Sequence, residues 1–132
     1  QHDLALRQHA RIGGEVLHGG ILSFEVVGGA RAGERVLNNA RLCSLVEHLG
    51  SVETLLTHPV SMTHADVPRE QRLAVGITDG LIRVSVGIED AGDIIEDLDR
   101  AITLAHDEEG SEDLEADVCP SADGRASCLA NV

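Results

Sequence analysis

The stretch ITDGLIRVSVGIED, residues 77–90, contains a segment typical of a β-strand. Side chains along a strand alternate between its two faces. The apolar residues of the segment therefore share one face: Ile82, Val84, Val86 and Ile88. Arg83 lies on the other face, and its guanidinium stays charged at any accessible pH and has five donors that need partners. We expect Arg83 to meet solvent, another subunit, another domain or a ligand.

The residues that follow this strand predict an amphipathic helix within residues 89–106. Apolar side chains recur there at the three- and four-residue spacing of one buried helix face: Ile94, Leu98, Ala101, Ile102 and Ala105. Asp90 is a suitable N-cap, because an aspartate side chain can accept hydrogen bonds from the free N–H groups of the first helical turn. The apolar face of the preceding strand is expected to pack under helices.

Shorter elements are predicted in the first half of the chain from the same periodicities and from the positions of glycine and proline. Along the sequence these are a helix over 3–11, a loop over 12–20, a strand over 21–27, a helix over 30–40, a strand over 42–46 and a helix over 67–76. This order predicts an α+β fold in which helices cover one face of a small sheet. Arg83 is then expected on the uncovered face.

One domain followed by a tail is expected. The periodic segments all lie within residues 1–106, which is enough chain to bury a core. Residues 107–132 contain eight acidic residues, one arginine and little periodicity. Such a composition is typical of disordered segments. We therefore expect a domain over 1–106 and an acidic disordered tail over 107–132.

Charge and composition restrict the partners of the chain. Its 132 residues have a formal net charge of -13, and all ten basic residues are arginine. An acidic surface repels nucleic acids and anionic membranes, and Phe24, the only residue among Phe, Tyr and Trp, provides no platform for base stacking. We expect a cytoplasmic protein, because no segment is typical of a membrane span or a signal peptide. The lysine-free, acid-rich composition is typical of salt-adapted proteins, with an ordinary acidic protein as the alternative.

The cysteines and histidines give little support for a metal site or a thiol nucleophile. Cys43, Cys119 and Cys128 are odd in number, and their spacing matches no metal motif. A reduced setting is the default for such a chain. The seven histidines are scattered, with no HxxxH pair on a predicted helix. Cys43 is expected to be a small buried side chain, and no role for Cys119 or Cys128 follows from the sequence.

Four motifs in the second half of the chain are specific enough to indicate a family. They are LG-x-VETL-x-x-HP over 49–59, SMTHA-x-VP over 61–68, GI-x-DGLIR-x-SVGIED over 76–90 and I-x-DLD-x-A over 95–101. In order and spacing they resemble the C-terminal domain of the cystathionine γ-synthase and γ-lyase family. These are pyridoxal-phosphate (PLP) enzymes of transsulfuration and methionine metabolism. The resemblance covers residues 2–105 and implies the small domain of a fold-type I PLP enzyme.

The resemblance also implies substrate-binding residues. In this family the arginine of the LIR-x-SVG strand, here Arg83, binds the α-carboxylate of the amino-acid substrate. From the pattern alone, an ion pair with a surface acid such as Glu25 would be the simpler interpretation. A serine of the family is replaced by His48, which brings substrate binding into question, and a merely exposed histidine is the alternative. Glu47 occurs in several cystathionine-handling members near the distal end of the substrate, and a solvated glutamate is the alternative there.

The absence of lysine limits what these 132 residues do alone. Covalent catalysis with PLP requires a lysine amine, and the chain also has no glycine-rich phosphate loop that opens a helix. In the family these parts lie on a larger preceding domain. The chain is therefore expected to be inactive alone and to work with a missing large domain and homo-oligomer partners, as a natural truncation, a split gene or an excised piece.

Two functions remain open from the sequence. In one, the chain completes the active site of a cystathionine γ-synthase, a γ-lyase or a homoserine-ester sulfhydrylase. In the other, it is a non-catalytic remnant or a stand-alone α+β interaction module. The motifs favour the first function, and the missing lysine favours the second for the chain in isolation.

Overall fold

The structure is a computed structural model that describes residues 2–9 and 11–116. Its helices are α1 (His2–Gln8), α2 (Gly29–Asn39), α3 (Arg69–Ala74) and α4 (Ala91–Ala116). Its strands are β1 (Arg11–Ile12), β2 (Glu15–Val16), β3 (Ile21–Glu25), β4 (Ser44–Leu45), β5 (Leu55–Thr57) and β6 (Leu81–Ser85). The predicted α+β class is confirmed. Within the described ranges, no helix combines the length and apolar character that a bilayer span requires.

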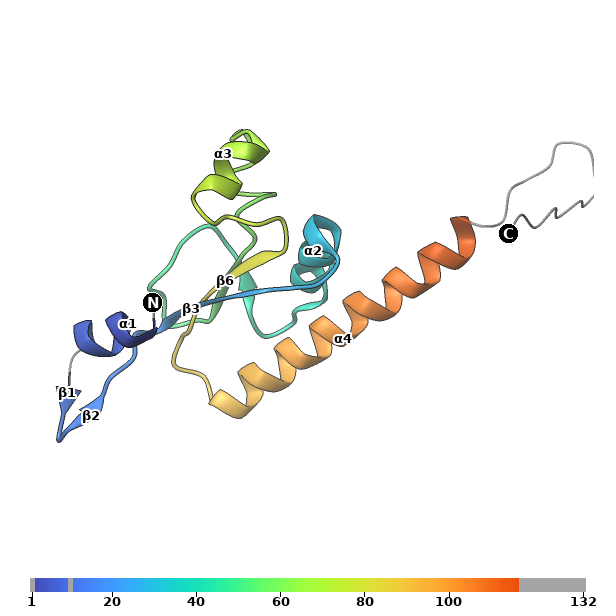
Figure 1. Cartoon of the computed structure of the whole chain (residues 1–132). Coiled ribbons are helices and arrows are strands. Elements are labelled where there is room, and N and C mark those ends of the chain that lie inside the picture. Colours follow the sequence, from blue (N-terminus) through green and yellow to red (C-terminus); the bar gives the residue numbers. More distant parts are fainter. Residues whose placement is uncertain (1, 10, 117–132) are drawn as a thin grey trace, which may run out of the picture.

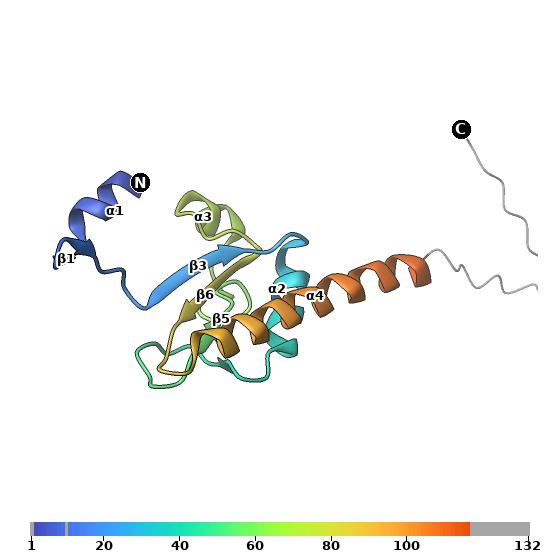
Figure 2. The ribbon, with the colours of Figure 1, turned by 90° about the horizontal axis from the view of Figure 1, so that it is seen from below.

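A four-stranded sheet with the order β3-β6-β5-β4 organises the molecule. Strand β6 runs antiparallel to both of its neighbours, whereas β4 and β5 are parallel. Helices α2 and α4 pack against each other and lie on one side of this sheet (Figures 1 and 2). Strands β6 and β5 are therefore the interior strands of the sheet.

The core between the sheet and the two helices is almost entirely aliphatic. Its buried members come from β5, β6, α2, α4 and the connections between them: Val26, Ala32, Val36, Leu37, Cys43, Leu56, Ile82, Val84, Ile94, Ala101 and Ala105. Phe24 and Met62 pack against this cluster at its edge. The predicted helix stripe is confirmed, because Leu98 and Ile102 also pack against the cluster.

The predicted strand at residues 82–88 is shorter than expected. Strand β6 ends at Ser85, and the side chains of Val86 and Ile88 are 37% and 82% exposed. Beyond Ser85 the chain passes close to residues 52 and 53, because an added Cβ on Gly87 would lie 2.4 Å from the carbonyl oxygen of Val52. The backbone must approach another segment closely there, and that takes the chain out of the sheet. The expectation that Val86 and Ile88 share the buried face was therefore wrong.

Helix α4 begins as predicted and ends later than predicted. The Asp90 carboxylate accepts a hydrogen bond from the backbone N–H of Gly92 at 2.8 Å, which confirms Asp90 as the cap. The helix continues to Ala116 and extends beyond the sheet in Figure 1. The expected start of the tail at residue 107 was thus too early, and residues 117–132 lie outside the described residues.

The predicted loop over residues 12–20 contains a small hairpin instead. Strands β1 and β2 pair antiparallel, with Ile12 opposite Glu15. Gly13 and Gly14 connect them with φ angles of 61° and 90°. Two consecutive positive φ angles are what a two-residue hairpin turn requires, and glycine adopts them without strain.

A buried carboxylate joins α4 to the segment that follows α2. The Asp97 side chain accepts backbone N–H groups of Arg41, Leu42 and Cys43 at 2.9–3.1 Å, and it pairs with Arg100. Burial on its own would raise the pKa of Asp97, but these hydrogen bonds outweigh it and lower the pKa to about 2. The carboxylate is therefore charged under all ordinary conditions.

Helix α2 lies close to the segment after β5 because it carries a glycine at the contact. A Cβ on Gly33 would lie 2.7 Å from Nε2 of His58. The His58 ring is fully buried, with Nε2 2.9 Å from the carbonyl oxygen of Asp79 and Nδ1 2.8 Å from Ser61 Oγ. Because a carbonyl oxygen only accepts, Nε2 is the donor in the first contact. This histidine connects the end of β5 to the turn that starts β6.

Gly33→Ala is expected to destabilise the fold although alanine favours helices. The new methyl group displaces the His58 ring and breaks its hydrogen bond to Asp79, and overpacking of this kind costs about 1–3 kcal/mol. Urea unfolding of the chain measures the change. Glu34→Ala, at the next and exposed position of α2, is the matched control and should leave the free energy of unfolding nearly unchanged. Equal stability of the two variants would contradict this account of Gly33.

Candidate functional site

Arg83 lies at the centre of β6, on the sheet face opposite α2 and α4. Its neighbours Ile82 and Val84 are fully buried in the helix-covered core, so alternation directs Arg83 the other way. In the sheet it stands between Ser23 on β3 and Thr57 on β5. The predicted placement of Arg83 on the face away from the helices is confirmed. The segment over residues 46–50 borders it there, so this face is only partly open.

The guanidinium of Arg83 is held by neutral acceptors at one nitrogen. Its Nη2 atom donates to the carbonyl oxygens of Glu47 and His48 at 3.0 and 3.1 Å, and to Thr57 Oγ1 at 2.9 Å. Its Nε atom is buried and has no hydrogen-bond partner. Within residues 2–9 and 11–116, no carboxylate forms an ion pair with Arg83, so the predicted alternative of an ion pair with Glu25 is not found.

This arrangement leaves a positive charge and part of its hydrogen-bonding capacity unmatched. Neutral carbonyl and hydroxyl oxygens orient a guanidinium without neutralising it. A planar guanidinium matches a carboxylate well, and charge-assisted hydrogen bonds are roughly twice as strong as neutral ones. The site can therefore bind an anionic group of carboxylate type.

Glu47 and His48 contact Arg83 through the main chain. Their side chains are exposed, and their carbonyl oxygens accept the hydrogen bonds. Any residue type at position 48 supplies a carbonyl oxygen, so the change from serine to histidine leaves this contact intact. The structure brings the three predicted residues together, and roles for the two side chains in substrate binding stay predictions.

Two further polar residues shape the site and were missed in the sequence. Thr57 Oγ1 donates to the carbonyl oxygen of Val46 at 2.7 Å while it accepts from Arg83. Ser85 Oγ accepts the backbone N–H of Gly50 at 3.0 Å. Both side chains are buried, and both hold the segment over residues 46–50 next to β6. No pattern local to either residue indicates this, because the contacts depend on the pairing of β5 with β6.

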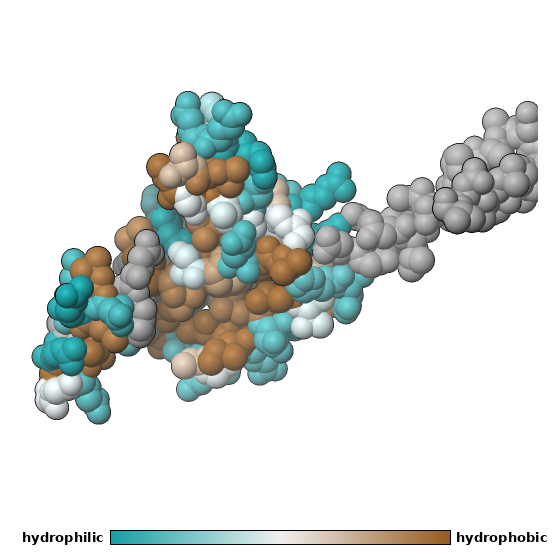
Figure 3. Space-filling model, in the orientation of Figure 1, coloured by the Kyte–Doolittle hydropathy of each residue, from teal (hydrophilic) through white to brown (hydrophobic). Residues whose placement is uncertain are grey.

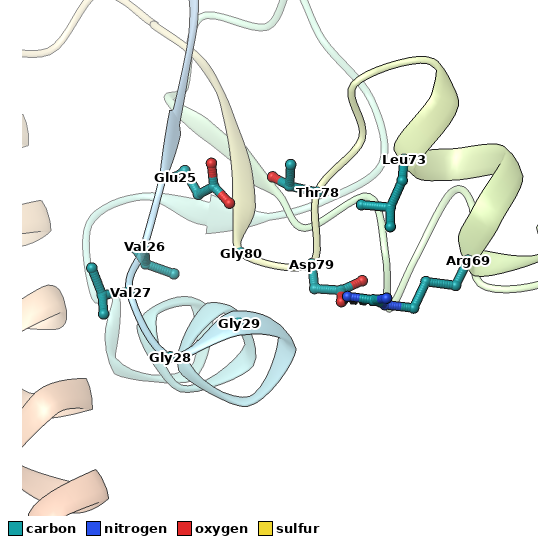
Figure 4. A pocket seen from close by; sticks show the side chains of 10 residues that line it. All are labelled: Glu25, Val26, Val27, Gly28, Gly29, Arg69, Leu73, Thr78, Asp79 and Gly80. Atoms are coloured by element: carbon teal, nitrogen blue, oxygen red, sulfur yellow. Dashed lines mark hydrogen bonds and ion pairs between the residues drawn. The ribbon is translucent and has the colours of Figure 1, made fainter.

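An open cavity of about 560 Å³ is lined by the end of β3, the start of α2, helix α3 and the turn that leads into β6 (Figure 4). Asp79, in that turn, contacts Arg69 at 2.7 Å and Arg72 at 3.1 Å. The hydrogen bond from Arg69 is the main cause that lowers the pKa of Asp79. An aspartate engaged by two arginines is a structural ion pair rather than an available acid or base. It fixes the turn from which β6 and Arg83 begin.

Other reactive side chains do not form a second centre in the described part of the chain. No group of three or more His, Cys, Asp or Glu there could hold a metal ion. His9 and His18 lie close together, with their Nδ1 atoms 3.2 Å apart, which the sequence did not indicate. Burial and the nearby Asp97 charge raise the pKa of the Cys43 thiol to about 12, so Cys43 is buried and unreactive as predicted. Cys119 and Cys128 lie outside the described residues.

The comparison with known families decides the identity of the chain at family level. Residues 1–103 match the model of the Cys/Met metabolism PLP-dependent enzymes. The chain belongs to this family. The four motifs and the α+β fold therefore have a common origin with those of Cys/Met metabolism enzymes.

Curated relatives of this family are γ-lyases from several organisms. The chain is 54% identical over 84 residues to L-methionine gamma-lyase of Fusobacterium nucleatum subsp. polymorphum, covering 64% of this chain and 21% of the relative. It is 48% identical over 101 residues to cystathionine gamma-lyase of Bacillus subtilis, covering 76% and 25%. The crystal structure of yeast cystathionine gamma-lyase matches with a TM-score of 0.72 at 43% identity, covering 80% of this chain and 26% of that one.

The chain spans about a fifth to a quarter of the length of these relatives. The structural match agrees with the predicted fold of a PLP enzyme of fold type I. Because the chain covers only this share of each relative, the relatives contain a large region with no counterpart in these 132 residues.

Proposed function

We propose that this chain is the C-terminal part of a PLP-dependent enzyme of sulfur amino acids, and that Arg83 binds the α-carboxylate of the substrate. The observation that carries the proposal is the state of Arg83. Its Nη2 atom is oriented by neutral acceptors, and its Nε atom is buried without a partner. Its Nη1 atom makes no hydrogen bond within the described residues, and a substrate carboxylate supplies the missing charge and an acceptor for this atom.

The residues of this chain do not fit covalent attachment of PLP. None of the 132 residues is a lysine, and the aspartate at the open cavity beside the turn into β6 is already paired with two arginines. PLP, the cofactor of the family, supplies the electron sink for bond cleavage next to an amino group. It would be held by a region outside this stretch, and the chain's own contribution is to bind and orient the substrate carboxylate.

The names of the relatives favour elimination among the possible reactions. The curated matches include cystathionine and methionine gamma-lyases. A γ-lyase acting on cystathionine or methionine is therefore preferred to a γ-synthase or a homoserine-ester sulfhydrylase. In that setting Glu47 and His48 border the substrate carboxylate through the main chain, and their exposed side chains remain candidates for contacts with the rest of the substrate.

Exposed apolar side chains support a partner region that covers part of this chain. Val52 and Ile88 are 65% and 82% exposed and are connected by a backbone hydrogen bond of 2.9 Å. Ile95 on α4 is 66% exposed. Figure 3 shows apolar surface over the sheet and the neighbouring helices. A large domain or a second subunit would remove such side chains from water, which is favourable.

A non-catalytic module is the second candidate, and the absence of lysine is the observation that favours it. One test distinguishes the two candidates. The protein is produced as its gene encodes it, with all sequence that precedes residue 1 in the reading frame, and PLP is added. We expect the visible absorption band of lysine-bound PLP and release of a thiol or hydrogen sulfide from a sulfur amino acid. A protein with no such band would contradict the enzyme proposal and support the non-catalytic module.

A further inference from the structure

Thr57 reaches Arg83 through its side chain, whereas Glu47 and His48 do so through main-chain carbonyls. Its Oγ1 atom lies 2.9 Å from Nη2 of Arg83, and its side chain is only 1% exposed. The two residues are direct cross-strand partners of β5 and β6. Side chains paired in this way lie on the same face at close distance. The register of the sheet therefore places the two side chains in contact.

The direction of the hydrogen bonds at Thr57 follows from the chemistry of its neighbours. The carbonyl oxygen of Val46, 2.7 Å from Oγ1, only accepts, so the threonine hydroxyl donates to it. Arginine only donates, so the same oxygen accepts from Arg83. The hydroxyl thus donates one hydrogen bond and accepts another. A methyl group in its place could neither donate to Val46 nor accept from Arg83.

The nitrogen atoms of Arg83 therefore differ in whether the protein supplies their hydrogen-bond acceptors. Nη2 carries two hydrogens, and three protein oxygens surround it. Its donors are therefore fully used by the protein, while Nε stays without a partner and Nη1 makes no hydrogen bond within the described residues. The contacts of Nη2 therefore determine which side of the guanidinium faces a ligand.

We propose that Thr57 is a positioning residue that holds Nη2 of Arg83 and so directs Nη1 toward the substrate carboxylate. This inference rests on the proposed carboxylate-binding role of Arg83. Without the Thr57 hydroxyl, Nη2 keeps only the carbonyl oxygens of Glu47 and His48, and the carbonyl of Val46 loses its donor. The guanidinium is then held from the 47–48 segment alone, and the binding geometry that the substrate meets is less well preset.

The test uses the full-length protein with PLP bound and compares Thr57→Val, which keeps the shape, with Thr57→Ser, which keeps the hydroxyl. Thr57→Val should raise KM for the amino-acid substrate and the Kd of L-alanine about tenfold, as for a lost hydrogen bond to a charged group. The Kd of ethylamine, which has no carboxylate, should not change, and kcat should fall less than kcat/KM. Thr57→Ser should restore the wild-type values.

Ser23→Ala is the matched control. Ser23 is the cross-strand partner of Arg83 on β3, but its hydroxyl forms no hydrogen bond to Arg83. Its removal should leave KM, Kd and kcat unchanged. If Thr57→Val does not fold, Thr57→Cys, whose thiol is only a weak acceptor, carries the same prediction with a smaller shift.

The possible failures are distinguishable. L-alanine binding by Thr57→Val at wild-type affinity, with binding lost in Arg83→Ala, would overturn the role of Thr57 and leave that of Arg83. An equal loss of L-alanine and ethylamine binding would also overturn it, because the effect would then not concern the carboxylate. Unchanged binding in Arg83→Ala would overturn the carboxylate-binding role itself.

Discussion

Replacing Arg83 by alanine is expected to weaken binding of an amino-acid substrate by on the order of a hundredfold or more. The estimate follows from the loss of charge-assisted hydrogen bonds, each worth roughly 1.5–3 kcal/mol. The visible band of bound PLP should persist, because no residue of this chain attaches the cofactor. Binding of L-alanine to the full-length protein, followed by calorimetry or by its effect on that band, measures the change.

Two controls make the Arg83 prediction specific. Ethylamine, which lacks the carboxylate, should bind Arg83→Ala and the wild type equally well. Arg31→Ala removes an arginine from the exposed face of α2 and makes the net charge more negative by the same amount without touching the site. A similar loss in both arginine variants would show that general charge, rather than the position of Arg83, is responsible.

Replacing Asp97 by alanine is expected to give the largest loss of stability, about 3–5 kcal/mol. Three backbone N–H groups and Arg100 lose their acceptor in a buried place. The segment over residues 41–43 then has no polar partner on α4. Urea unfolding followed by circular dichroism measures the loss. Asp99→Ala, at an exposed position of the same helix, should change the free energy of unfolding by less than about 0.5 kcal/mol.

The lowered pKa of Asp97 also predicts how stability depends on pH. An aspartate has a pKa of about 3.9 in the unfolded chain, against about 2 here. The unfolded state therefore binds a proton first, and the stabilisation is fully present above about pH 5. It is lost as the pH falls through 4 toward 2, by about 2–3 kcal/mol. Asp97→Asn, which cannot titrate, should lack this part of the acid dependence, and an unchanged acid profile in this variant would contradict the assignment.

Local patterns predicted the elements with long, regular periodicity. The stripe from Ile94 to Ala105 and the Asp90 cap depend on neighbours three or four residues apart, so the sequence alone contains them. The face to which Arg83 points likewise follows from alternation with Ile82 and Val84. These are properties that a single helix or strand determines by itself.

The errors concern features that depend on contacts between distant segments. The strand ends before Val86 because Gly87 approaches residues 52 and 53 closely, and nothing in residues 82–88 indicates that approach. The glycine pair at 13 and 14 was placed in a loop and not assigned to a hairpin. Thr57 could not be selected because its role requires the β5–β6 register.

At the candidate site, the sequence predicted which residues lie together but not which of their atoms make the contacts. Motif resemblance selected Arg83, Glu47 and His48, and the structure does bring them together. Residues 47 and 48 contact Arg83 through carbonyl oxygens, which every residue has, so sequence cannot distinguish which residue types position 48 tolerates. A change from serine to histidine is therefore compatible with a held Arg83.

The most direct test of the account is a crystal structure of the full-length protein with PLP and a bound amino acid. We predict that an oxygen of the α-carboxylate lies within about 3.2 Å of Nη1 of Arg83, while Nη2 keeps its contacts to Thr57 and to the carbonyls of residues 47 and 48. A carboxylate bound elsewhere, with Arg83 contacting only protein oxygens, would contradict it.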